Sequence, residues 1–234
     1  WINDSQGKGR SQNFVKLQEM RLDSLTFYNL TAVEVDLAYS PVLACLGIDG
    51  IVGANLMRQG YWEIDFDKKL LRFSNRRKFW QKQAEHTIPF GIKSTGTPVL
   101  NLRIGSGMVK GITFDSGSTG YLSLPETLYG GDDEPVNVRW GYLSSGIYGS
   151  LLDTARERDL AIKLDSAEYS IPIKFETGKG GKLLGMSFLE NFLVQLDWDE
   201  QQIHLSPRQK INWQNDSTFG IIPHYQDSVL IVGS

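Results

Sequence analysis

Residues 183–206 read LLGMSFLENFLVQLDWDEQQIHLS, and residues 51–74 read IVGANLMRQGYWEIDFDKKLLRFS. The two segments align without a gap when Gly185 is laid on Gly53, a shift of 185 − 53 = 132 residues. Each copy reads as an apolar pair, a glycine, a short helical turn, and two strands around a turn of the form Asp-aromatic-Asp. The sequence therefore predicts an internal duplication with one half-buried hairpin in each copy.

Four aspartates lie in the two matched turns: Asp65, Asp67, Asp197 and Asp199. Aspartate is common in turns because its carboxylate accepts hydrogen bonds from nearby backbone N–H groups. We therefore expect these side chains to shape the turns, and not to serve as acids or metal ligands.

The composition favours short strands over long helices. The chain has 234 residues, of which 41% are hydrophobic, enough to bury a sizeable core. Its 24 glycines and 11% aromatic residues, with many β-branched residues between turn-forming clusters, are typical of β structure. We expect a mainly β fold.

Charge and cysteine content exclude several classes of partner. A net charge of −3 gives no clustered basic surface for a phosphate backbone, so we expect no nucleic acid partner. The single cysteine, Cys45, cannot form an internal disulfide, and we expect it to be a small buried residue. No apolar run approaches the roughly 18 residues that a membrane span needs, so we expect no integral membrane span.

One acidic loop stands out as a candidate for chemistry. Met108–Phe114 reads as a strand, Asp115–Gly120 follows as DSGSTG, and Tyr121–Pro125 resumes the apolar alternation. A carboxylate held between two strands is rigidly positioned, as catalysis requires. The simpler alternative, in which Ser116 and Ser118 only satisfy the turn, stays open.

The motif Phe114–Ser118, together with the later apolar-apolar-glycine segment Leu183–Gly185, resembles the pepsin-like and retropepsin-like aspartic proteases, including the bacterial retropepsin-like type. The resemblance covers roughly residues 50–75 and 87–207. It implies two similar β-barrel-like lobes, the first of them incomplete. It also implies hydrolysis of peptide bonds by a water that two aspartates activate, with a peptide or protein as substrate and neither cofactor nor metal.

The same resemblance gives each loop residue a role. Asp115 would be one member of the catalytic pair, and Ser116 would hydrogen-bond across to the opposite loop. Gly117 would allow close backbone approach, and Ser118 would orient the carboxylate. All four are therefore catalytic-site candidates.

The resemblance divides the chain into four parts. Residues 1–75 are expected to form a first lobe without its Asp loop, 76–86 a connecting segment, and 87–210 the second lobe. Residues 211–234 are expected to be a tail or the start of a further module, such as a PDZ-like one.

No Asp-Thr/Ser-Gly occurs in residues 1–75, and the repeat offset places the counterpart of Asp115 at 115 − 132 = −17. We therefore expect an N-terminal truncation, with the second aspartate upstream. Residues 1–17 resemble the second half of a lobe, beginning at a flap hairpin whose tip holds Gly7 and Gly9. The equivalent stretch of the second lobe, residues 136–148, could line a peptide groove, although Trp140 and Tyr142 in it are more often core residues.

Three alternatives remain beside the active peptidase. A catalytically inactive peptide-binding relative would keep the groove with one acid. An obligate dimer is superfluous when the lobe is already duplicated, so a monomer is favoured. A serine hydrolase lacks support because no Gly-x-Ser-x-Gly motif occurs, and His86, His204 and His224 have no recognisable partner. The resemblance slightly favours a periplasmic or extracytoplasmic location, which the residues themselves leave unknown.

Overall fold

The computed structural model describes residues 2–4, 7–76, 78–80, 84–130, 137–177, 180–208, 211, 213, 222–226 and 229–233. The structure is 56% strand and 9% helix, which confirms the mainly β fold. Among the described residues, no helix has the length and apolar character to cross a membrane.

The elements follow one another as a series of hairpins with very short helices between them. The strands are β1 (Ile2–Asn3), β2 (Gly9–Arg10), β3 (Asn13–Leu22), β4 (Leu25–Glu34), β5 (Tyr61–Asp65), β6 (Leu70–Ser74), β7 (His86–Ile92), β8 (Pro98–Ile104), β9 (Gly107–Phe114), β10 (Leu122–Pro125), β11 (Asn137–Gly146), β12 (Gly149–Leu164), β13 (Ala167–Glu176), β14 (Leu183–Leu184), β15 (Phe192–Asp197), β16 (Gln202–Pro207), β17 (Ile222–Gln226) and β18 (Val229–Gly233). The helical turns are η1 (Leu37–Tyr39), α1 (Pro41–Cys45), α2 (Ala54–Met57), η2 (Glu126–Leu128) and α3 (Met186–Leu189).

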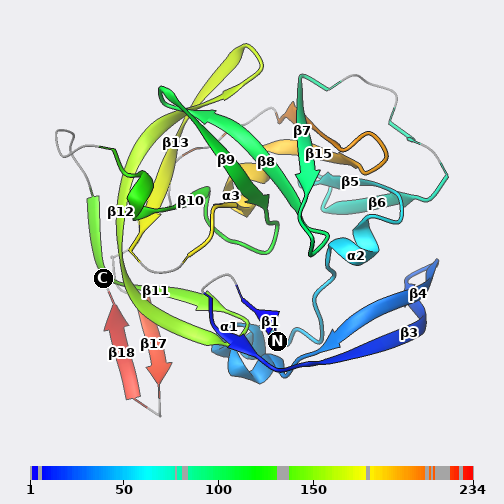
Figure 1. The fold of residues 1–234 in the computed structure, drawn as a ribbon, viewed down its shortest axis with the longest axis horizontal. Coiled ribbons are helices and arrows are strands. Elements are labelled where there is room, and N and C mark those ends of the chain that lie inside the picture. The colour runs from blue at the N-terminus through cyan, green and yellow to red at the C-terminus, as the bar shows by residue number, and fades with distance from the viewer. Residues whose placement is uncertain are drawn as a thin grey trace.

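A closed six-stranded β-barrel forms the largest unit (Figure 1). Its strands are hydrogen-bonded in the order β12-β13-β10-β14-β9-β8, and a β12–β8 pairing through Ile162↔Ile104 closes the ring. Every second side chain along a strand points into the barrel, and apolar side chains such as Leu100, Ile162 and Ile173 are fully buried. The apolar–polar pattern of these strands is therefore the pattern of a barrel wall.

A second run of strands leaves the barrel through β7, in the order β7-β16-β15-β5-β6. At its centre β15 pairs antiparallel with β5, and Gln195 lies directly opposite Glu63. The matched hairpins β5–β6 and β15–β16 thus lie side by side in one sheet.

The two segments matched at offset 132 fold alike. Gly53 and Gly185 each precede a four-residue helix in extended backbone. The carboxylate of Asp65 accepts a hydrogen bond from Lys68 N (3.1 Å), and that of Asp197 accepts one from Glu200 N (3.0 Å). The predicted hairpins and the turn-shaping role of these two aspartates are confirmed.

A second match, at a different offset, was missed by the sequence analysis. The β3–β4 turn and the β12–β13 turn both contain Leu-Asp-Ser, and Asp23 and Asp165 have matching positive φ values of 51° and 50°. The offset here is 165 − 23 = 142 residues, so 142 − 132 = 10 extra residues lie between β4 and α2. The segment with η1 and α1 falls in that longer connection.

Strands β1 and β2 pair antiparallel near the start of the chain, and Gly9 lies in β2 opposite Asn3, not at the tip as expected. Ile2 pairs with Arg10 across β1 and β2, and Gly7 turns the chain at φ +76°. The β1–β2 hairpin contacts the tip of the β11–β12 hairpin, where Lys8 Nζ donates to Ser150 O at 2.9 Å.

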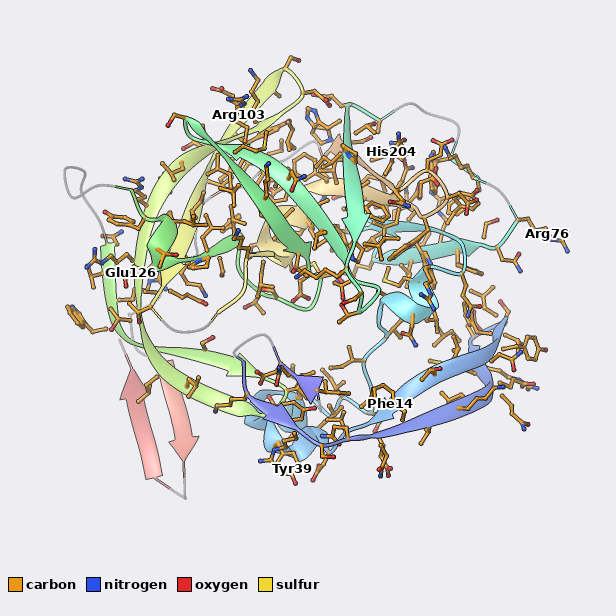
Figure 2. The ribbon with its side chains drawn as sticks, viewed as in Figure 1. Phe14, Tyr39, Arg76, Arg103, Glu126 and His204 are labelled. Carbon is orange, nitrogen blue, oxygen red and sulfur yellow. The ribbon has the colours of Figure 1, made fainter. Side chains whose placement is uncertain are left out.

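Several local expectations are wrong. Cys45 is exposed, because α1 lies at the surface, and Trp140 is 68% exposed and therefore not a core residue. The side chain of Tyr142 lies outside the described residues. Strands β17 and β18 pair with each other in the antiparallel sense. Figure 2 shows Phe14 and Tyr39 at the lower edge of the molecule, and both side chains are exposed.

Candidate functional site: the acidic loop

The loop with Asp115 connects the two strands that flank β14. Strand β9 ends at Phe114, which pairs in parallel with Leu184. Strand β10 begins at Leu122, which pairs with Leu184 from the other side and in the antiparallel sense. The loop therefore has to cross over the end of β14, and this topology fixes its position at the edge of the barrel.

Backbone hydrogen bonds fasten the loop to the segment that follows β14. They are Asp115 N to Leu184 O (3.0 Å), Gly185 N to Tyr121 O (2.9 Å) and Met186 N to Ser118 O (2.7 Å). The loop therefore packs directly on Leu184, Gly185 and Met186.

Glycine is required at position 185 by space. A Cβ there would overlap the carbonyl oxygen of Gly120 and lie 2.8 Å from that of Ser118. Both atoms are backbone, so they could move only with the loop itself. At the matched Gly53, a Cβ would meet only the side-chain oxygen of Asn55, at 3.1 Å.

The carboxylate of Asp115 is half-buried and held locally. Its Oδ1 accepts a hydrogen bond from Gly117 N at 2.9 Å, and the backbone of Ser118 donates to Asp115 O at 3.2 Å. Gly117 also lets its backbone approach closely, since a Cβ there would lie 3.2 Å from Oδ1. The arrangement orients one carboxylate at a rigid strand end while leaving it in contact with solvent, which suits proton transfer.

Ser116, Gly117 and Ser118 lie in this loop directly after Asp115. Gly117 and Ser118 contribute backbone groups to the loop contacts. The side-chain roles given to Ser116 and Ser118 by the resemblance stay predictions.

One positioning residue was missed by the sequence analysis. Ser187 Oγ donates to Thr119 O at 2.6 Å and ties the first turn of α3 to the loop. Its repeat counterpart, 187 − 132 = 55, is Asn55, whose side chain also donates to a backbone carbonyl, that of Thr31, at 2.6 Å. The signal in the sequence was that the matched helical positions 55 and 187 both hold a polar residue.

The histidines have partners other than the loop serines. His86 is buried, with Nε2 2.7 Å from the Tyr169 hydroxyl, and His204 Nδ1 lies 3.0 Å from Thr87 Oγ1. Burial lowers the pKa of His204 and so favours its neutral form. The side chain of His224 lies outside the described residues. These contacts give a Ser–His relay no support.

Within the described part of the chain, no three His, Cys, Asp or Glu side chains gather as a metal site. Comparison with known protein families finds no family model that matches the chain, and no curated protein matches it either.

Proposed function

We propose that this chain is part of an aspartic-type endopeptidase of the pepsin/retropepsin-like class. Asp115 supplies one carboxylate of a catalytic pair, and a second acidic loop, from residues outside this sequence, supplies the other. The observation that carries the proposal is the acidic loop fastened over β14 through Gly185. A tight acidic turn that only reversed the chain would not need backbone hydrogen bonds to Leu184, Gly185 and Met186.

The matched halves support a missing counterpart of this loop. In three matched pairs of residues, the member in the half that carries β7–β10 is buried and the member in the other half is exposed. The exposed fractions are 1% for Phe175 against 36% for Val33, 1% for Leu184 against 45% for Val52, and 1% for Ile203 against 56% for Leu71. Strands equivalent to β7–β10 would cover the exposed members and bring an acidic loop to the end of the segment before Gly53.

The chemistry follows from placing two carboxylates face to face. Because like charges at close range cannot both ionise, the pair shares one proton. The ionised member takes a proton from a bound water as that water attacks the peptide carbonyl. The protonated member donates a hydrogen bond to the oxygen on which negative charge develops. The step forms the C–O bond, and collapse of the tetrahedral intermediate then breaks the C–N bond with proton transfer to the leaving amine.

A catalytically inactive peptide-binding relative is the second candidate. It is favoured by the presence of one Asp-Ser-Gly in the 234 residues. The peptidase and the inactive relative differ in one feature. In the peptidase, the additional strands that cover Val52 carry a second catalytic aspartate, and in the inactive relative they do not.

The test uses the natural protein, with its mass measured and the region before Trp1 sequenced. An upstream Asp-Thr/Ser-Gly supports the peptidase, and its absence supports the inactive relative. Cleavage of a peptide library by the natural protein is then compared with that of Asp115→Asn and of a control, Asp159→Asn, at an exposed position on β12. Cleavage should be lost in the first variant and kept in the second. Turnover by Asp115→Asn at the wild-type rate overturns the proposal.

A further inference from the structure

A pocket of about 140 Å³ opens directly beside the point where the acidic loop enters β10. Its lining comes from the loop exit and from four strands, β10, β11, β12 and β13. The lining residues are Gly120, Tyr121, Leu122, Ser123, Arg139, Glu157, Pro172 and Lys174. In Figure 1 these elements lie together on the side of the barrel that carries β10, β12 and β13.

Strand register brings polar side chains together at this pocket. Glu157 of β12 lies opposite Lys174 of β13, which in turn lies opposite Ser123 of β10. The neighbouring positions Leu122 and Ile173 are buried in the apolar core. Because side chains alternate along a strand, the row of polar residues faces out of the barrel and forms one wall of the pocket.

Arg139 is the group in this wall that suits an anion. Arg139 Nη2 lies 3.0 Å from Glu157 Oε2, and Lys174 Nζ lies 2.7 Å from Glu176 Oε1. Glu157 and Glu176 balance the two cations, so the four groups have a formal charge of 2 − 2 = 0, and the case for an anion rests on the guanidinium of Arg139. The Arg139 side chain is 41% exposed, and a guanidinium offers five N–H donors in a planar fork that suits a carboxylate.

The ion pairs also hold the two cations in place before any ligand arrives. Glu157 and Lys174 are largely buried, with 14% and 15% of their side chains exposed. Side chains that are already ordered lose little entropy on binding, so a ligand carboxylate meets a formed site.

We propose that this pocket binds the carboxylate of a peptide's aspartate or glutamate side chain, and so selects acidic peptides beside the loop. The inference rests on the proposed function for its biological meaning, since it names a substrate class for the same site. The binding itself requires no catalysis.

The test measures binding of N-acetyl-glutamate amide and N-acetyl-glutamine amide to the present chain, by NMR shifts of the Gly120 and Ser123 amides. The acid should bind with an affinity about tenfold higher than the amide, as expected when a charge-assisted hydrogen bond is lost. Arg139→Gln should remove this difference. Arg156→Gln is the control, because Arg156 lies on β12 but pairs with Glu126, 3.1 Å away.

Equal binding of the two probes, or acid preference unchanged in Arg139→Gln, overturns the inference. Should that variant not fold, Lys174→Gln gives the same readout. The outcome is independent of peptidase activity. Acid binding with no cleavage by the natural protein supports the pocket and contradicts the proposed function. Cleavage without acid preference supports the proposed function and contradicts the pocket.

Discussion

Gln195 Nε2 donates a hydrogen bond to Glu63 Oε2 at 2.6 Å, between two residues that are repeat equivalents of each other (195 − 63 = 132). Their strands run antiparallel, and the neighbouring pairs Val194↔Ile64 and Leu196↔Trp62 are exchanged by the same shift. A local two-fold axis therefore passes through this buried pair. The two matched segments therefore meet through their equivalent strands, β5 and β15.

Replacing Glu63 by Ala should destabilise the protein. Glu63 and Gln195 are 2% and 4% exposed, and Arg72 also pairs with Glu63, so the change leaves a buried amide without its acceptor. We expect a loss of about 1–3 kcal/mol in the free energy of unfolding, measured by urea denaturation.

The control is Glu19→Ala, since the ion pair of Glu19 with Arg21 is solvent-exposed and should contribute less than about 1 kcal/mol. Equal effects of the two changes would show that the buried pair on the axis is not a stabilising contact.

Gly185→Ala and Gly53→Ala should differ, although the glycines are repeat equivalents. At position 185 the methyl group meets backbone atoms of the acidic loop, whereas at position 53 it meets only the end of the Asn55 side chain. We expect Gly185→Ala to lose about 1–3 kcal/mol and Gly53→Ala less than 1 kcal/mol.

Thermal unfolding measures the difference, and amide exchange of Asp115 and Ser118 locates it. If the amide exchange rates of Asp115 and Ser118 did not change in Gly185→Ala, close packing of the loop on Gly185 would be contradicted.

The hairpins and their turns were predictable because the signals are local. Apolar alternation, Asp65 and Asp197 at turn positions, and a glycine before a helical turn act within a few residues. The match of β3–β4 with β12–β13 was not found because its offset, 142 residues, is ten longer than the offset of 132 at which the sequence was compared with itself.

Side-chain partners between the halves were not predictable. Asp67 and Asp199 are repeat equivalents, yet Asp67 pairs with Arg208 whereas Asp199 accepts a hydrogen bond from Tyr61. Tyr61 and Arg208 are not equivalent positions, because 208 − 132 = 76. The motif likewise indicated Asp115 but not Ser187, since a hydrogen bond between a helix and a loop 68 residues away depends on the folded topology.

Tyr61 should titrate unusually late. Its hydrogen bond to the Asp199 carboxylate favours the neutral phenol and raises the pKa of Tyr61 to about 12. Because the folded-state pKa lies above the unfolded value near 10, the contribution to stability is present below about pH 10 and is lost as pH rises towards 12.

Tyrosinate absorbance, taken as the difference between wild type and Tyr61→Phe, measures this titration. Asp199→Asn should shift it to lower pH. A titration midpoint that does not change in that variant would exclude Asp199 as the cause.

Leu184→Ala and Val52→Ala test the asymmetry between the halves. Leu184 lies between β9 and β10 and is 1% exposed, so its truncation should leave a cavity and lower the free energy of unfolding by about 2–5 kcal/mol. Val52 is 45% exposed and should lose less than about 1 kcal/mol in this chain. Under the proposed function, strands of the natural protein cover Val52, and the same change there should approach the effect of Leu184→Ala. Denaturation of both variants in the two lengths of protein separates these cases: a small effect of Val52→Ala in the natural protein would mean that no equivalent of β9 and β10 packs on it.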